Sequence, residues 1–125
     1  MANTATSPVI VLGQGIAGLS AAIALGSAGY PVHLIGRRQA EVGGLQLSPN
    51  GFRALASLGL QKDILGKAVR LNSVIIKTLS ANRCLTEIIH EPQHLHAAIS
   101  RQDVIDCLVA KAENLSCIRF TDTEI

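Results

Sequence analysis

The segment from Val9 to Gly36 constrains the fold more than any other part of this 125-residue chain. It opens with the short apolar run Val9–Leu12, passes through a glycine-rich turn, and enters an Ala- and Leu-rich run that reaches about Ala28. A second apolar run covers Val32–Ile35. Short apolar runs on either side of a helical segment are typical of buried parallel strands. The segment therefore predicts a strand–helix–strand unit and an α/β fold.

The turn in this unit has the spacing G-x-G-x-x-G. The first glycine permits a tight exit from the strand, the second lets a pyrophosphate approach the backbone, and the third lets the helix pack closely. The start of the following helix then presents free N–H groups and a positive dipole end to the phosphates. This Rossmann-like pattern predicts a dinucleotide site, the alternative being the same unit without a ligand. The residues concerned are Gly13, Gly15, Ile16, Ala17 and Gly18.

One position departs from the fingerprint. An acidic residue about 20 residues after the turn normally binds the ribose hydroxyls at the end of the second strand. Gly36 stands at that position here, and Arg37 and Arg38 follow it. Two cations without the acid are a fair pattern for a 2′-phosphate site, so an NADP(H)-binding oxidoreductase module stays open as an alternative.

Composition narrows the class of protein. Hydrophobic residues make up 48% of the chain and aromatic residues 2%, which suits aliphatic packing between helices and a sheet. A net charge of +2 is too small for a nucleic-acid footprint. No apolar run reaches the roughly 18 residues that span a bilayer, and no basic segment of a signal peptide precedes the first helix. We therefore expect a cytoplasmic protein that binds neither nucleic acid nor membrane.

Cysteines and histidines do not indicate a metal site. Cys84, Cys107 and Cys117 are odd in number and lack C-x-x-C spacing, so reduced thiols are expected. Three histidines fall between His90 and His96, where His94 and His96 would point the same way on an extended chain. No cysteine or aspartate nearby completes a ligand set, which favours solvated or structural histidines over an incidental metal site.

The rest of the chain alternates between helical and strand patterns. Gly43 and Gly44 form either a simple turn or a close approach to a ligand. Ser48 and Pro49 open a helix that Gly59 ends. The other expected elements are a helical segment over 61–67, strands over 71–79 and 84–89 joined by a turn, a helix capped by Ser100 that Asn114 ends, and a strand from Cys117 to Thr121.

Three stretches in this order resemble a known family. They are the opening unit from Gly13 to Arg37, the run G-G-L-Q-L-S-P-N at 43–50 with its helix from Phe52 to Leu60, and Ile99–Val104. Together they are similar to the N-terminal part of FAD-dependent aromatic-ring monooxygenases, the flavin hydroxylases that act on salicylate, hydroxybenzoate and ubiquinone precursors. The resemblance covers nearly the whole chain. It implies FAD as cofactor, NAD(P)H as co-substrate and a small aromatic substrate.

The resemblance also implies roles for single residues. The glycines of the turn would hold the FAD pyrophosphate, and Arg37 would lie by the adenosine end. Gly44 and Gln46 would lie on a loop that approaches the ribityl and flavin part. Arg101 would hold the FAD from the next helix, the alternative being a surface cation in the first turn of that helix. No catalytic residue is assigned.

The chain departs from the family in Gly36 and in its length. The later D-G and G-D-A motifs and most of the substrate domain are absent, so we expect a truncated chain, weakly active or inactive alone. Its sheet would have an unpaired edge open to self-association. The expected organisation is a tail over 1–7, an FAD-binding part over 8–70, a substrate-domain hairpin over 71–98, and a return helix and strand over 99–125. A non-enzymatic remnant with a decayed site is the remaining alternative.

Overall fold

The computed structural model describes residues 7–38 and 40–124. By its internal contacts the chain divides into two compact units, one of Met1–Gly43 with Arg101–Ile125 and one of Gly44–Ser100. The tail expected over 1–7 lies outside the described residues apart from Ser7, and so does the last residue, Ile125.

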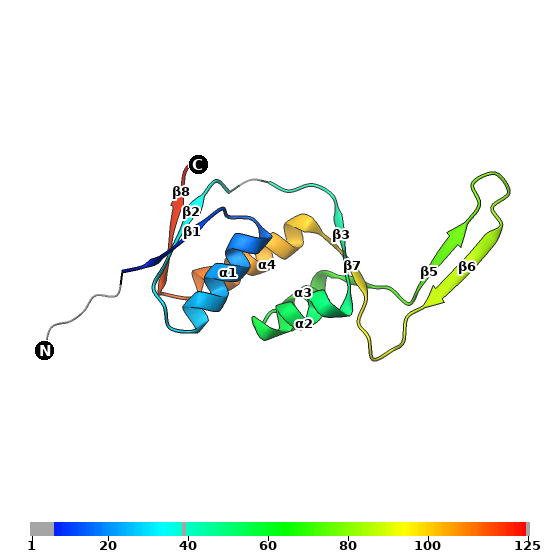
Figure 1. Ribbon diagram of the computed structural model, residues 1–125, viewed down its shortest axis with the longest axis horizontal. Coiled ribbons are helices and arrows are strands. Elements are labelled where there is room, and N and C mark those ends of the chain that lie inside the picture. The colour runs from blue at the N-terminus through cyan, green and yellow to red at the C-terminus, as the bar shows by residue number, and fades with distance from the viewer. Residues whose placement is uncertain (1–6, 39, 125) are drawn as a thin grey trace, which may run out of the picture. The chain divides into compact units, whose positions relative to one another are not determined.

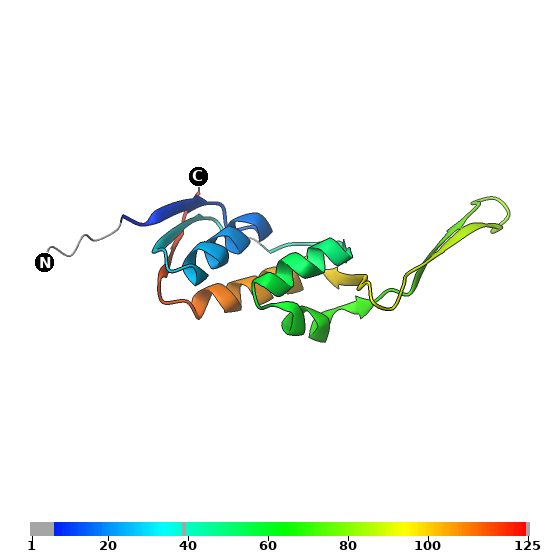
Figure 2. The same ribbon diagram turned by 60° about the horizontal axis from the view of Figure 1, so that its bottom comes forward.

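The first unit is built on a parallel three-stranded sheet (Figure 1). Its strands are β1 (Val9–Leu12), β2 (Val32–Gly36) and β8 (Ile118–Asp122), with β2 in the middle. Helices α1 (Ile16–Ser27) and α4 (Arg101–Glu113) lie side by side on one face of this sheet, as the two views in Figures 1 and 2 agree. The predicted strand–helix–strand unit and the α/β class are confirmed.

Aliphatic side chains fill the space between the sheet and the two helices. The middle strand alternates, with Val32 and Leu34 buried and His33 and Ile35 half-buried on the other face. Fully or nearly fully buried helix residues are Leu19, Ala22, Ile23, Val104, Ile105, Cys107, Leu108 and Ala112. On α4 these buried residues form one apolar face, and Val109 beside them is half-buried.

The opposite face of the sheet is open within the described residues. On β1, the side chains of Ile10 and Leu12 are 53% and 62% exposed. On the same face, the imidazole Nε2 of His33 lies 2.7 Å from the hydroxyl of Thr121, which links β2 to β8. In the described sheet β1 pairs with β2 alone, so its other edge carries the unpaired backbone groups that the sequence predicts.

The second unit contains two small antiparallel sheets and two helices. In one sheet β7 (Ala97–Ser100) lies between β3 (Gly44–Leu47) and β4 (Val69–Arg70). The other is the predicted hairpin of β5 (Ser73–Lys77) and β6 (Cys84–Ile89). The helices are α2 (Pro49–Ser57) and α3 (Gln61–Lys67).

The sequence analysis missed three of these strands, and its loop at Gly44 and Gln46 is wrong. Both residues lie on β3, where Gly44 pairs with Ser100 and Gln46 with Ala98. The strands β3, β4 and β7 are short, and β7 opens with two alanines, which have low strand propensity. Pairing between segments far apart in the sequence forms them, and no local pattern signals it.

The ends of α2 follow the local rules. The hydroxyl of Ser48 accepts a hydrogen bond from the N–H of Gly51 at 3.5 Å, with Pro49 at the first helical position. After the helix, Gly59 has φ +75°, and the N–H of Leu60 donates to the carbonyl of Leu55 at 2.9 Å. The side chain of Leu60 is fully buried, as is usual for the apolar residue that follows a glycine C-cap, and the predicted helix end at Gly59 is confirmed.

The β5–β6 hairpin is apolar yet exposed. Every residue of β6 is exposed in the described structure. Exposed large apolar side chains on the two strands are Ile75, Ile76, Leu85, Ile88 and Ile89. Such a surface on a two-stranded sheet is typical of a face that other protein covers. Within the described residues, no helix is both long and apolar enough to cross a bilayer.

We predict that Gly18→Ala destabilises the first unit. A β-carbon at Gly18 would lie 1.9 Å from the carbonyl oxygen of Gly13, so α1 and the turn must separate. Overpacking of this kind costs about 1–3 kcal/mol, to be measured by urea unfolding followed by circular dichroism. The matched control is Gly66→Ala, at a helical glycine whose added β-carbon meets nothing within 4 Å. Equal unfolding free energies for the two variants would contradict the packing argument.

Candidate nucleotide-binding site

The glycine turn is shaped for a ligand at the start of α1. Gly13 has φ +99°, and its N–H donates to the carbonyl of Ile35 at 2.7 Å, which anchors the turn to β2. Gly15 is the N-cap residue of α1, and no side chain caps this helix. A β-carbon added at Gly13 or Gly15 would meet nothing within 4 Å. The turn is therefore open where a phosphate would approach the first helical N–H groups.

Gly36 lies against this turn, which explains the missing acid. Its φ is +154°, and an added β-carbon would lie 2.9 Å from the Cα of Gly13 and 3.0 Å from the nitrogen of Gln14. No side chain fits at this position unless the turn moves. The loss of the carboxylate at the end of β2 is thus tied to the particular packing of the turn.

Gln14 is a buried polar residue of the turn that the sequence analysis did not single out. Its side chain is 6% exposed, and its Nε2 donates to the carbonyl of Gly36 at 2.6 Å and to that of Thr121 at 3.3 Å. Because both partners are carbonyls, chemistry fixes which end of the amide is nitrogen. The amide oxygen Oε1 is buried and has no hydrogen-bond partner among the described residues.

A signal for Gln14 was present in the sequence. It is a long polar residue between two fingerprint glycines, at the edge where a nucleotide would pack, and it coincides with a glycine at the acid position. In the structure the Gln14 amide donates hydrogen bonds to carbonyls at the carboxyl ends of β2 and β8. Gln14 and Gly36 are therefore in direct contact, and the choice of residue at one position affects the other.

The two arginines after β2 are both held by carboxylates. Arg37 forms an exposed ion pair with Glu124, with Nη1 2.7 Å from Oε1. Arg38 lies 3.4 Å from the carboxylate of Glu113, and its guanidinium carbon is 5.5 Å from the centre of the Phe120 ring. Exposed ion pairs contribute little stability, so a ligand phosphate could displace either carboxylate.

Arg101 joins the start of α4 to the loop after β2. Its Nε lies 2.9 Å from the carboxylate Oε2 of Glu41, and its backbone N–H donates to the carbonyl of Gly43 at 2.9 Å. The side-chain oxygen of Gln102 accepts a hydrogen bond from the N–H of Glu41 at 2.8 Å. Arg101 is thus engaged with a carboxylate in the first unit, whereas Gly44 and Gln46 belong to the second.

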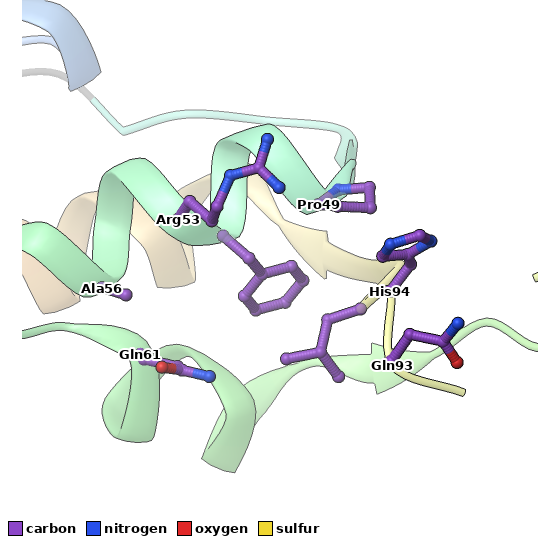
Figure 3. A pocket seen from close by; sticks show the side chains of 8 residues that line it. Pro49, Arg53, Ala56, Gln61, Gln93 and His94 are labelled. Carbon is purple, nitrogen blue, oxygen red and sulfur yellow. The ribbon is translucent and has the colours of Figure 1, made fainter. Parts of the chain in front are cut away.

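The second unit has a pocket of its own, of about 200 Å³ (Figure 3). Arg53 and Ala56 line it from α2, Gln61 from the start of α3, and Gln93 and His94 from the segment before β7. No residue of the glycine turn lines this pocket, and neither Gly44 nor Gln46 does. The pocket is therefore separate from every predicted cofactor residue.

The histidine segment forms a stacked pair. The imidazole rings of His90 and His96 have centroids 3.6 Å apart and an interplanar angle of 6°. Desolvation, followed by the nearby His90 and His94, lowers the pKa of His96 below its ordinary value of 6.5, which favours a neutral ring in the stack. Among the described residues no three His, Cys, Asp or Glu side chains are placed to hold a metal ion.

The residues of the first unit fit the pyrophosphate and adenosine half of a dinucleotide. The glycine turn is open, the helix start is uncapped, and the Gln14 amide leaves an unsatisfied acceptor beside them. This fold and this turn define a dinucleotide-binding protein of the Rossmann type.

Comparison with known proteins gives the family. Residues 8–115 match the family model described as Glucose inhibited division protein A, and the chain belongs to this family. It is also 39% identical over 78 residues to 3-hydroxybenzoate 6-hydroxylase of Polaromonas naphthalenivorans, covering 59% of this chain and 19% of the relative. It is 34% identical over 115 residues to 3-amino-4-hydroxybenzoate 2-monooxygenase of Streptomyces cremeus, covering 82% and 28%.

A solved structure agrees. The tetrameric form of 2-methyl-3-hydroxypyridine-5-carboxylic acid oxygenase superposes with a TM-score of 0.82 at 28% identity, over 93% of this chain and 32% of that one. The expected resemblance to FAD-dependent aromatic-ring monooxygenases is confirmed, and the chain has the FAD-binding fold of that group. It spans between 19% and 28% of the length of the curated relatives it matches.

We predict that Gly36→Ala destabilises the protein more than Gly43→Ala does. Gly43 also has a positive φ, +95°, but a β-carbon there would meet nothing within 4 Å. Gly43→Ala thus measures backbone strain alone, of order 1–3 kcal/mol, while Gly36→Ala adds contact with the glycine turn. Urea unfolding followed by circular dichroism measures both. Equal losses would contradict the claim that the turn excludes a side chain at position 36.

Proposed function

We propose that this chain is the FAD-binding portion of a flavin-dependent monooxygenase that hydroxylates a small aromatic or quinone-precursor substrate with NAD(P)H and O₂. The open glycine turn at the uncapped start of α1 is the observation that carries the proposal. The curated relatives support the reaction class, because both described above are named as hydroxylases or monooxygenases of hydroxybenzoates.

In this proposal the first unit holds the nucleotide half of FAD. The N–H groups of Ile16, Ala17 and Gly18 face the pyrophosphate, since residues in the first turn of a helix have no partner within it. Gly13 and Gly15 let the phosphates reach the backbone. Arg37 lies toward the adenosine end. When bound, FAD supplies the electron transfer and the oxygen chemistry, and the protein positions it and excludes water.

Three further residues are proposed as cofactor contacts. Arg101 exchanges its Glu41 partner for the cofactor when FAD binds. Gly44 and Gln46 reach the ribityl and flavin part from β3, where both are exposed. Catalytic residues remain unassigned, because the chain spans less than a third of its curated relatives. We therefore expect the chain alone to be weakly active or inactive.

An NADP(H)-binding module is the second candidate. Arg37 and Arg38 would form its 2′-phosphate site, but each is paired with a carboxylate, Glu124 or Glu113. A 2′-phosphate would take the place of one of these acids, and such exposed ion pairs contribute little stability. Separate titrations with NADPH and FAD distinguish the two, and tight NADPH binding without FAD binding would favour the module. A folded chain with no affinity for either nucleotide would support a non-enzymatic remnant.

The open surfaces fit a longer or self-associating protein. The unpaired edge of β1 and the exposed apolar hairpin of β5 and β6 both offer surface that further chain would cover. Self-association through the β1 edge is the corresponding proposal for the chain by itself. The free thiols of the exposed Cys84 and the half-buried Cys117 are consistent with the proposed cytoplasmic location.

We predict that Gly15→Ala abolishes FAD binding and leaves the fold intact. Its methyl group meets no protein atom within 4 Å and enters the space proposed for the pyrophosphate. Quenching of flavin fluorescence on titration with protein measures the affinity, and circular dichroism checks the fold. Gly66→Ala is the control that keeps wild-type affinity. FAD binding by Gly15→Ala at wild-type strength would refute the placement of the pyrophosphate.

A further inference from the structure

The carboxylate missing from the end of β2 has a counterpart on the neighbouring strand. In the parallel ladder between β2 and β8, Gly36 is paired directly with Asp122. Neighbouring strands lie about 4.8 Å apart, so the two residues lie next to each other at the carboxyl ends of their strands. Asp122 is exposed there, and its Oδ1 accepts a hydrogen bond from the backbone N–H of Arg38 at 3.3 Å.

Asp122 lines a hollow at this edge. The hollow has a volume of about 280 Å³, and its other lining residues are Arg37, Thr123 and Glu124. Glu124 is engaged with the guanidinium of Arg37 at 2.7 Å. Of the two acids in the hollow, Asp122 is therefore the one placed beside Gly36, and Glu124 neutralises the adjacent cation.

A buried amide lies beside the same edge. Gln14 is 6% exposed, and its Nε2 donates to Gly36 and to Thr121, the residue directly before Asp122. Its Oε1 has no partner among the described residues, and a buried acceptor left unpaired costs about 1–3 kcal/mol. The edge therefore combines an exposed carboxylate with an unsatisfied amide oxygen, and both accept hydrogen bonds from hydroxyl groups.

We propose that Asp122 binds the ribose hydroxyls of the adenosine half of the dinucleotide, in place of an acid at the end of β2. The Gln14 amide keeps its Nε2 bonds to the carbonyls of Gly36 and Thr121, which hold the ends of β2 and β8 together beside the ligand. The proposal rests on the proposed function, because it needs a dinucleotide at the glycine turn. It makes Asp122 a ligand-binding residue contributed by β8.

The register supports this assignment physically. A side chain at position 36 conflicts with the glycine turn, whereas position 122 is exposed at the end of its strand. A carboxylate on β8 rather than β2 still offers the ribose a charge-assisted hydrogen-bond acceptor at the carboxyl ends of the strands, and the turn keeps its position. The Arg38 N–H holds one carboxylate oxygen at 3.3 Å, which orients the group.

The test is calorimetric titration of the 125-residue chain with ADP and with 2′,3′-dideoxy-ADP, alongside FAD. The wild-type chain should prefer ADP to its dideoxy analogue. Asp122→Asn should weaken ADP binding by roughly tenfold to a hundredfold and remove that preference, since hydrogen bonds to charged groups contribute about 1.5–3 kcal/mol. Asp122→Ala should do the same, which guards against a residual bond from the asparagine amide.

Asp106→Asn is the control, because Asp106 is an exposed carboxylate on α4 whose bond is to Gln102 within the same helix. It should bind ADP as the wild type does. If wild-type chain binds ADP and FAD but Asp122→Asn binds both equally well, the role of Asp122 is wrong while the proposed function stands. If the wild-type chain binds neither ADP nor FAD, the proposed function fails, and the role of Asp122 fails with it.

Discussion

The close approach of Gly18 to the carbonyl of Gly13 is the contact on which the first unit depends. It brings α1 down onto the turn after β1, and a single added β-carbon at 1.9 Å would prevent it. With α1 at this distance, Leu19, Ala22 and Ile23 reach the buried face of β2. The same contact leaves the start of the helix uncapped and open. The backbone arrangement that packs α1 against the sheet therefore also leaves the start of α1 accessible to a ligand.

This tight turn has a consequence at the end of β2. The backbone of Gly13 and Gln14 fills the space in which a side chain at position 36 would begin. The chain has glycine there, and the Gln14 amide lies against its carbonyl. Glycine at position 36 therefore follows from the packing of the turn, because the backbone of the turn and the Gln14 amide both contact this residue. In our proposal the ribose hydroxyls are bound instead by Asp122, the last residue of β8, which is paired with Gly36.

Local pattern predicted most of the first unit and the helices of the second. The strands β1 and β2, the open turn, the Ser48 cap and the Leu60 contact each follow from spacing or capping chemistry within a few residues. The strands β3, β4 and β7 could not be predicted in this way, because their pairing partners lie far along the chain.

The residues of the candidate site likewise fall into those that local sequence predicts and those that depend on contacts between distant segments. The glycines were evident from the fingerprint, whereas Gln14 depends on two carbonyls at sequence separations of 22 and 107 residues. The ion pairs of Arg37 and Arg101 also join distant segments. A sequence shows which residues are available for such contacts, and the fold decides which of them meet.

The most direct test of the account is a nuclear magnetic resonance titration of the labelled chain with ADP. If the open turn at the start of α1 holds the pyrophosphate, the amide signals of Gly15, Ile16, Ala17 and Gly18 will shift most. Shifts concentrated instead at Arg53, Gln61 and His94, which line the pocket of the second unit, would contradict it.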